Sequence, residues 1–300
     1  MLKLGTVFSG IGAIEHALER LSIPHDIAFA CDNGNIEIDL ERDEIEKNLK
    51  NLNSFKDKKA YVDGLYAKKK KKNFVEESYQ ANYNIPQEHF HYDVRFLDGY
   101  QYRNEIDLFV GGSPCQSFSM VGKRGGFEDT RGTMFFEIQR ILCEKRPKAF
   151  LLENVKQLKG HDKGRTLQTI LNILTGESNI SLDDIPMSED ARNSLGKKLN
   201  YWVDFKVLRA ADFGVPQNRE RVIFLCSKDK KIELPLPTIN KPITVREAIE
   251  DLAYLESNEG CFEQDYITKA KSEYQKAMRV DSNKLYNHKA SNHSEIAIYK

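Results

Sequence analysis

Residues 107–119 have the sequence Asp-Leu-Phe-Val-Gly-Gly-Ser-Pro-Cys-Gln-Ser-Phe-Ser. The apolar run 107–111 predicts a short buried strand, which Gly-Gly-Ser-Pro ends abruptly. Cys115 therefore follows the carboxyl end of a strand, where open α/β sheets place their chemistry. Pro114 has a fixed φ and stiffens the loop that carries the thiol. Cys115 is a candidate nucleophile, although from this segment alone a small buried core cysteine is an equal alternative.

Strand-like and helix-like segments alternate on both sides of this stretch. The pattern predicts strands at 2–8, 26–31, 107–111 and 149–152, and helices at 13–21, 74–83, 133–144 and 166–174. Such alternation implies an α/β fold with a parallel sheet and helices on both faces. The strand-like runs 202–209 and 221–227 are too close in sequence for a crossover helix between them, so we expect an antiparallel hairpin there.

Two polar regions interrupt this pattern. Residues 36–75 are densely charged, with helical spacing in their first part and five lysines at 68–72, and residues 175–199 are polar without a clear period. We interpret both as insertions, the second as a loop, and the lysine run as an exposed tip rather than a nucleic-acid patch. Further on, 244–252 predicts a helix with Thr244 and Glu247 in capping-box spacing. The stretch after it is polar and shows no further element.

Composition narrows the class of protein. The chain has 300 residues, with 45 basic and 45 acidic side chains, so no global charge indicates a nucleic-acid partner, although a local basic face is compatible with this balance. Five scattered cysteines without a Cys-x-x-Cys pair argue against a disulfide framework or a zinc site, and for a reducing cytoplasm. No apolar stretch reaches the roughly 20 residues that span a bilayer, so we expect no membrane partner.

A glycine-rich turn lies directly between the first strand and the first helix, in Phe8-Ser-Gly-Ile-Gly12. Gly10 and Gly12 allow a tight turn and a close approach of the backbone to a ligand. Asp32 ends the second strand, where a carboxylate can accept hydrogen bonds from both hydroxyls of a ribose. The third glycine of the dinucleotide fingerprint is absent, which disfavours NAD and leaves a smaller adenosine ligand.

Two more segments carry polar groups at predicted strand ends. Glu153, in Leu-Leu-Glu-Asn-Val, lies on the same rim as Cys115 and is suited to proton donation, although it can also cap the following helix. Arg219 and Arg221 share one face of an extended segment. Their guanidinium groups suit a carbonyl or phosphate ligand, and surface salt bridges are an equal alternative.

As a set, these segments resemble the C5-cytosine-specific DNA methyltransferases of the bacterial or phage modification type. The order Phe-Ser-Gly-Ile-Gly, Pro-Cys-Gln, Glu-Asn-Val, Gln-x-Arg-x-Arg is the order in that family, at similar spacing, and residues 126–136 and 207–214 also match. The resemblance implies a Rossmann-like fold for S-adenosylmethionine-dependent methyl transfer, with a mostly parallel sheet and one antiparallel hairpin strand. It covers residues 1–228, which we expect to be the catalytic, cofactor-binding domain.

The resemblance further implies a reaction. S-adenosylmethionine would donate a methyl group to carbon-5 of a cytosine flipped out of double-stranded DNA, through a covalent bond from Cys115 to carbon-6, as part of a restriction-modification system. Glu153 would hold the ring edge and Arg221 its carbonyl. The implied catalytic residues are Cys115, Glu153, Arg219, Arg221, Pro114, Gln116 and Asn154. The implied cofactor contacts are Phe8, Ser9, Gly10, Gly12, Asp32 (ribose), Asn33, Asp93 and Val94 (adenine edge), Gly112, Pro114 and Met134 (methionine moiety).

The chain departs from the family pattern after residue 228. Residues 229–300 look like the segment that leads into a target-recognition region, and neither that region nor the late Gly-Asn motif follows. We expect either a fragment of a longer enzyme or the catalytic subunit of a split methyltransferase that needs a complementing C-terminal chain. A tRNA cytosine methyltransferase would share the catalytic motifs. A nicotinamide dehydrogenase would share the fold without a role for Pro-Cys-Gln. A non-catalytic interaction subunit would be expected to have lost Cys115 or Glu153, and both are present.

Overall fold

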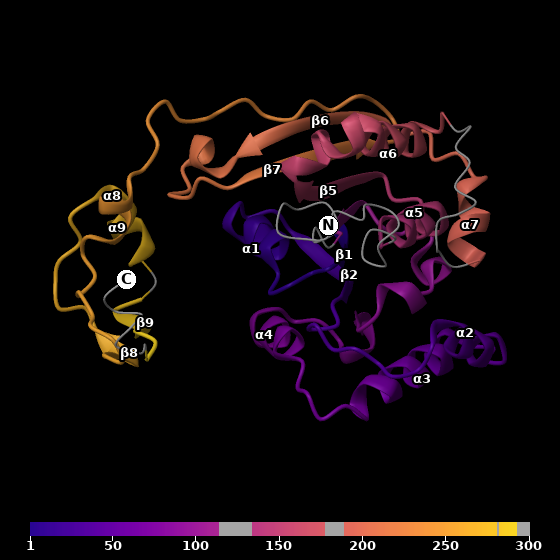
Figure 1. Ribbon diagram of the computed structural model, residues 1–300, viewed down its shortest axis with the longest axis horizontal. Coiled ribbons are helices and arrows are strands. Elements are labelled where there is room, and N and C mark those ends of the chain that lie inside the picture. The colour runs from indigo at the N-terminus through magenta and orange to yellow at the C-terminus, as the bar shows by residue number, and fades with distance from the viewer. Residues whose placement is uncertain (114–133, 178–188, 281, 293–300) are drawn as a thin grey trace. The chain divides into compact units, whose positions relative to one another are not determined.

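A computed structural model of the protein describes residues 1–113, 134–177, 189–280 and 282–292 (Figure 1). The chain divides into two compact units. The first comprises Met1–Val207 and Arg221–Pro235, and the second comprises Leu208–Glu220 and Leu236–Lys300. The predicted catalytic motifs that the structure describes lie in the first unit, except Arg219. The predicted division of function at residue 228 stays a prediction.

The main sheet has seven strands within the described residues, in the order β3-β2-β1-β4-β5-β7-β6. Its strands are β1 (Leu2–Val7), β2 (His25–Cys31), β3 (Phe90–His91), β4 (Leu108–Gly111), β5 (Ala149–Val155), β6 (Trp202–Arg209) and β7 (Glu220–Ser227). β1 to β5 pair in parallel, whereas β7 runs antiparallel to β5 and pairs with β6 at the sheet edge. The predicted α/β fold, with a mostly parallel sheet and an antiparallel hairpin, is confirmed.

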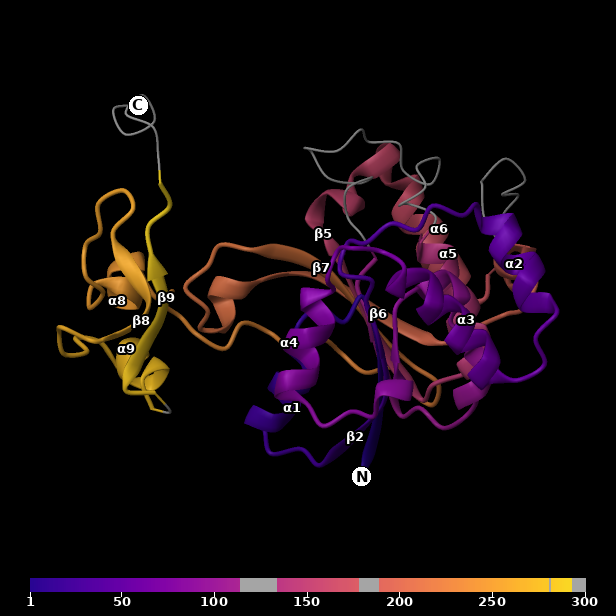
Figure 2. The ribbon, with the colours of Figure 1, turned by 90° about the horizontal axis from the view of Figure 1, so that it is seen from below.

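Helices cover both faces of this sheet, as the alternation predicted (Figure 2). The helices of the first unit are α1 (Ala13–Arg20), α2 (Arg42–Lys50), α3 (Phe55–Ala67), α4 (Phe74–Asn82), α5 (Met134–Lys145), α6 (Arg165–Thr175) and α7 (Glu189–Leu195). Successive strand residues point to opposite faces, so Phe29 belongs to the core cluster that includes side chains of α5 and α6, whereas Ala30 belongs to the cluster that includes Tyr79 of α4. α1 contributes Leu18 to the same side as α4.

The insertion 36–75 is helical rather than irregular. α3 begins after Ser54, whose hydroxyl accepts a hydrogen bond from the Asp57 N–H at 3.0 Å. The insertion has its own small core, which contains Ile36, Val62 and Tyr66. Of the lysine run, Lys68 and residues 70–72 are exposed between α3 and α4, as predicted for a tip, whereas Lys69 is half-buried and pairs with Asp39.

The prediction of a loop at 175–199 is wrong in its last part, because α7 forms there. Only Ala191 and Ser194 of α7 are buried, so the helix has too few apolar positions to show a period. Its contact with α5 includes a hydrogen bond, in which the Gln139 side chain donates to the Ser194 carbonyl at 2.8 Å, while Ala191 belongs to the main core. Residues 178–188 lie outside the described residues.

The second unit also contains elements that the sequence pattern missed. Residues after 252 form β8 (Gly260–Asp265), α9 (Glu273–Met278) and β9 (Lys284–Lys289), with β8 antiparallel to β9. Both strands are largely exposed and polar, so no alternating pattern marked them. α8 (Val245–Ile249) begins at the predicted capping box, in which Thr244 and Glu247 bond each other's backbone N–H groups.

Within the described residues, no helix is long and apolar enough to cross a membrane.

α5 buries a lysine in the main core. Lys145 has no exposed surface, and its ammonium nitrogen lies 4.2 Å from the ring centroid of Phe29 and 4.4 Å from that of Tyr102. The nitrogen has no hydrogen-bond partner among the residues that the structure describes. Burial lowers the pKa of Lys145 to about 7, because the charged form is poorly solvated there.

Replacing Lys145 by Met is expected to raise the free energy of unfolding near neutral pH by on the order of 1–4 kcal/mol, because a neutral side chain of similar length replaces an unsolvated charge. Between a pKa of about 7 in the folded chain and its ordinary value of 10.5, Lys145 binds more protons in the unfolded chain. The free energy of unfolding of the wild type should therefore rise with pH across this window. The gain is complete above about 10.5, and it is lost again as pH falls through about 7. Urea unfolding at several pH values measures this slope, and an equal slope in Lys145→Met would contradict the assignment.

Candidate functional site

Strand register brings the ends of β1, β2 and β4 to the level of Leu152 in β5. Val7 is the register partner of both Cys31 and Gly111, and Gly111 is the partner of Leu152. Because these strands are parallel, the residues that follow each of them lie along the same rim of the sheet. Those residues are Phe8, Asp32, Gly112 and Glu153. All four were predicted to be functional.

The turn after β1 is tied to the end of β2. The Ser9 N–H donates to the Cys31 carbonyl at 3.2 Å, and the Cys31 N–H donates to Ser9 Oγ at 2.9 Å. The Asp32 carboxylate accepts from the Gly10 N–H and the Gly34 N–H, both at 2.9 Å. Each carboxylate oxygen still has acceptor capacity, and Asp32 is only half-buried. The carboxylate is therefore fixed at this rim and can accept further hydrogen bonds.

The two glycines of this turn have different roles. Gly10 and Gly12 have φ of 55° and 86°, in the left-handed region. A Cβ on Gly10 would meet no atom within 4 Å, whereas one on Gly12 would lie 2.1 Å from a ring carbon of Tyr83. The Tyr83 hydroxyl also donates to the Gly12 carbonyl at 2.7 Å. Gly10 therefore leaves space for a ligand, while Gly12 is required by internal packing. Phe8 also has a positive φ, 53°, which places backbone strain at this turn.

Asp93 and Val94, after β3, are both buried. The Asp93 carboxylate accepts from the Tyr66 hydroxyl at 2.7 Å and from the Arg95 side chain at 2.7–3.2 Å. The Val94 carbonyl accepts from Arg140 at 3.0 Å. Both residues are held by partners from other elements, so this segment has a defined geometry.

Asn33 and Met134 occupy less constrained positions. The Asn33 side chain accepts from the Asn35 N–H at 3.0 Å and donates to the Ile36 carbonyl at 3.2 Å, which closes a turn after β2. Met134 begins α5, is half-buried and packs against the main core.

Glu153 and Arg221 form an ion pair across the antiparallel strands β5 and β7, with 2.5 Å between Arg221 Nε and Glu153 Oε1. Their side chains are 34% and 23% exposed, so a ligand can reach both. β5 extends to Val155, which places Glu153 within the strand rather than at its end. Arg221 thus forms a salt bridge, which was the alternative for this residue, and its partner is Glu153 of the adjacent strand. Glu153 does not cap the helix that follows β5, whose N-cap residue is Val155.

The chain that leads to Pro114 is bonded to the same strand. The Asn154 side chain donates to Ser113 Oγ at 2.9 Å. A Cβ on Gly112 would lie 3.2 Å from Glu153 Oε2, so glycine permits a close approach there. Ser113, Glu153 and Asn154 line one cavity, together with apolar side chains that include Leu152 and Phe224.

The geometry above does not include four predicted site residues, three of which the structure does not describe. Pro114, Cys115 and Gln116 lie outside the described residues. Arg219 belongs to the second unit, where its carbonyl accepts from the Ala210 N–H at 2.9 Å.

Sequence analysis missed a buried polar group beneath the glycine turn. Glu15 is 1% exposed and accepts from the Thr6 hydroxyl at 3.0 Å and the Tyr79 hydroxyl at 2.6 Å. Thr6 also lies 2.8 Å from the Ser9 hydroxyl. In the sequence, Glu15 is simply an acidic residue in the first turn of a predicted helix. Such residues are ordinarily exposed beside the helix N-terminus, so the pattern did not indicate burial.

The profile of the family described as C-5 cytosine-specific DNA methylase matches residues 2–177 and 190–299. The chain is 46% identical over 158 residues to the Type II methyltransferase M1.ScrFI of Lactococcus lactis subsp. cremoris, covering 53% of this chain and 34% of that protein. It is 50% identical over 119 residues to the Type II methyltransferase M.HpaII of Haemophilus parainfluenzae, covering 39% of this chain and 27% of that protein. The matched segments therefore span about a third of these relatives.

A solved structure shares the fold. It is described as a candidate DNA modification methyltransferase encoded within a prophage (E. coli), and aligns with a TM-score of 0.53 at 18% identity. The alignment covers 99% of this chain and 73% of that one.

Substituting Gly12 by Ala should destabilise the protein more than substituting Gly10 by Ala. Both changes place a Cβ at positive φ, at a cost of about 1–2 kcal/mol, but only the Cβ at position 12 overlaps the Tyr83 ring. We expect an additional loss of about 1–3 kcal/mol for Gly12→Ala. Denaturant unfolding of the two variants tests this difference, and equal losses would show that the Tyr83 ring moves away without cost.

Proposed function

The chain belongs to the C-5 cytosine-specific DNA methylase family, and from this we propose that the complete protein methylates carbon-5 of cytosine in double-stranded DNA. The matched segments span about a third of the relatives' length, so the activity is proposed for the intact gene product. The Type II methyltransferases among the relatives support a role in a restriction-modification system. We propose the reducing cytoplasm as its location, because the four described cysteines are unpaired.

The observation that best supports this function is the Glu153–Arg221 pair beside the chain that enters Pro114-Cys115-Gln116. A carboxyl group and a guanidinium on one rim offer complementary groups to the ring edge and carbonyl of a pyrimidine. The Asn154–Ser113 hydrogen bond fixes the start of the cysteine segment to the strand that carries Glu153. We infer that Cys115, two residues after Ser113 in the sequence, acts beside these two polar groups.

In the proposed reaction, the Cys115 thiolate adds to carbon-6 of a cytosine that has left the duplex. The new S–C bond displaces the electron pair of the C5–C6 double bond, so carbon-5 becomes nucleophilic. Carbon-5 then gains the methyl group. Loss of the C5 proton to a base and departure of the thiolate restore the double bond and release Cys115.

Glu153 and Arg221 assist the first step. Glu153 holds a proton at ring N3, which lowers the electron density that carbon-6 presents to the thiolate. Arg221 donates to the O2 carbonyl, where negative charge develops. Their mutual ion pair must be exchanged for these contacts when the base enters, and their partial exposure permits this.

The first unit has the groups that an adenosine cofactor requires. The open space beside Gly10 and the half-buried Asp32 carboxylate fit a ribose next to the β1 turn. Asp93 and Val94 would contact the adenine edge, Phe8, Ser9 and Asn33 would complete the adenosine pocket, and Gly112, Pro114 and Met134 would lie near the methionine moiety. S-adenosylmethionine, when bound, supplies the electrophilic methyl group.

Replacing Cys115 by Ser should abolish covalent trapping on duplex DNA that contains 5-fluorocytosine, because the serine hydroxyl is a far weaker nucleophile than a thiolate. The intact gene product and S-adenosylmethionine are incubated with the DNA, and the adduct is measured by denaturing electrophoresis. Cys261→Ser is the matched control, since Cys261 is an exposed thiol of the second unit. A Cys115→Ser adduct at the wild-type level, or no adduct with the wild type, would favour a non-catalytic interaction protein.

Replacing Glu153 by Gln should lower kcat by about 100-fold or more, because an amide cannot hold the proton at N3. Binding of S-adenosylmethionine should stay unchanged. Glu105→Gln provides a control, because it removes an exposed carboxylate that pairs with Lys3 at 3.6 Å. Incorporation of tritiated methyl groups into DNA measures kcat, and a wild-type kcat for Glu153→Gln would refute the assigned role.

A further inference from the structure

The turn after β3, residues Asp93–Leu97, is held from α5 through its backbone carbonyls. Arg140 donates one nitrogen to the Leu97 carbonyl at 3.0 Å and another to the Val94 carbonyl at 3.0 Å. It also approaches the Arg95 carbonyl at 3.4 Å. Arg140 is only 5% exposed, so these are buried charge-assisted hydrogen bonds.

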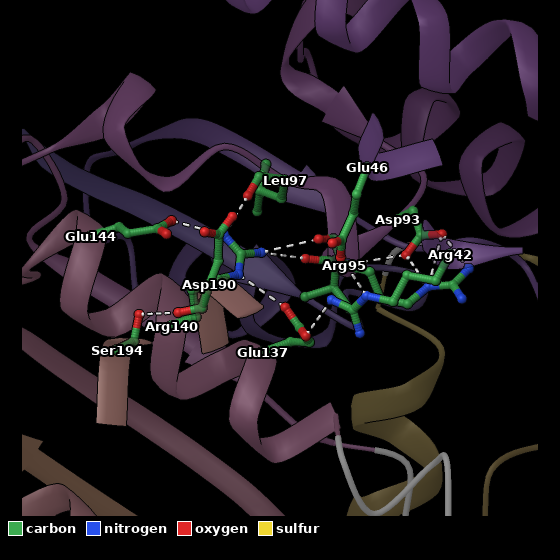
Figure 3. A network of polar contacts seen from close by, with 11 residues as sticks. Arg42, Glu46, Asp93, Arg95, Leu97, Glu137, Arg140, Glu144, Asp190 and Ser194 are labelled. Atoms are coloured by element: carbon green, nitrogen blue, oxygen red, sulfur yellow. Dashed lines mark hydrogen bonds and ion pairs between the residues drawn. The ribbon is translucent and has the colours of Figure 1, made fainter. Parts of the chain in front are cut away.

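Arg140 is itself held by two carboxylates on α5 (Figure 3). Its Nε lies 2.9 Å from Glu137 Oε2, and Nη1, which also donates to the Leu97 carbonyl, lies 2.8 Å from Glu144 Oε2. Glu144 also accepts from the Gly99 N–H at 2.9 Å. The guanidinium therefore has one orientation, in which every contact supports the turn.

The insertion reaches the same network from α2. Arg42 lies 2.6 Å from Glu137 Oε1 and, through its Nε, 2.7 Å from Glu46 (Figure 3). Glu137 is thus shared between the two arginines, and it is 1% exposed. Removing the insertion would remove this ion pair from the buried carboxylate.

The insertion also contacts Asp93 directly, from α3. The Tyr66 hydroxyl donates to Asp93 Oδ2 at 2.7 Å, and the Tyr66 ring stacks on Tyr92 with centroids 5.1 Å apart. Burial, followed by the charge of Asp93, raises the pKa of Tyr66, so its hydroxyl stays protonated and donates. Arg95 holds the other side of the same carboxylate.

We propose that Tyr66 and Arg140 are positioning residues that fix the Asp93–Leu97 turn for recognition of the adenine base, so that the 36–75 insertion sets cofactor affinity and base selectivity. The inference rests on the proposed function, in which Asp93 and Val94 contact the adenine edge. Tyr66 orients the Asp93 carboxylate, and Arg140 fixes the peptide planes that follow Val94 and Leu97. A purely structural brace would stabilise the fold without affecting which base is bound.

The experiment measures dissociation constants of the intact gene product for S-adenosylhomocysteine and S-inosylhomocysteine. The inosine form replaces the 6-amino donor by a carbonyl, which a carboxylate cannot hydrogen-bond. The wild type should bind the adenosine form about tenfold more tightly or better, the value of one charge-assisted hydrogen bond. Tyr66→Phe keeps the ring and its stacking, and should reduce this preference about threefold or more.

Tyr61→Phe is the matched control. Tyr61 lies in the same helix, and its hydroxyl accepts from the Asn48 side chain at 2.8 Å without reaching the turn. It should change the unfolding midpoint without changing the preference between the two ligands. Arg140→Lys keeps a positive charge between the two glutamates, but one ammonium cannot satisfy the guanidinium's contacts. Arg140→Lys should also reduce the preference for the adenosine form. Its far-UV circular dichroism spectrum should match that of the wild type, which shows that the variant is folded.

The outcomes separate the inference from the function. A reduced preference in Tyr66→Phe alongside an unchanged one in Tyr61→Phe supports the inference. Wild-type preference in a folded Tyr66→Phe would overturn it and leave the proposed function intact. Failure of the wild type to bind S-adenosylhomocysteine, or equal binding of both ligands, would contradict the assigned cofactor contacts and the inference with them.

Discussion

The parallel hydrogen-bond register of β2, β1, β4 and β5 places the ends of the first three strands level with Leu152 of β5. This alignment brings Asp32, the Phe8–Gly12 turn and Glu153 to a common rim, although they are far apart in sequence. The register between paired strands sets the level of the residues near their ends, so a shift of register would separate these groups. The bonds of Ser9 to Cys31 and of Gly10 to Asp32 maintain the alignment beyond the strands themselves.

Helix α5 contains two buried basic side chains, Arg140 and Lys145, whose positive charges are balanced by different partners. Arg140 has two carboxylates and backbone carbonyls around it, so its charge is balanced and its position is fixed. Lys145 has the faces of two aromatic rings and no hydrogen-bond partner among the described residues. Cation–π attraction recovers only part of the solvation that burial removes. In the same helix, the charge of Arg140 thus fixes local geometry, whereas the charge of Lys145 lowers the stability of the fold.

The sequence pattern predicted elements that have strong periodicity and missed those that do not. β1, β2 and β4 are mainly apolar segments, and α5 has apolar residues at helical spacing, so local composition was enough. β8 and β9 are polar and exposed, and only their mutual pairing makes them strands. Arg140 was missed for a related reason, because Glu137, Arg140 and Glu144 share one helix face and such a charged face is usually solvated.

The sequence alone predicted Asp32, Glu153 and Arg221, since glycine, proline and polar residues mark strands and their ends locally. Asp32 does follow β2, whereas Glu153 lies within β5 and Arg221 near the start of β7. Only the tertiary structure decided what these residues contact. It paired Glu153 with Arg221, distinguished the open Gly10 from the packed Gly12, and placed Tyr66 of the insertion against Asp93. Periodicity is a property of neighbouring residues, whereas such contacts depend on strand register and helix packing between distant segments, which no local pattern encodes.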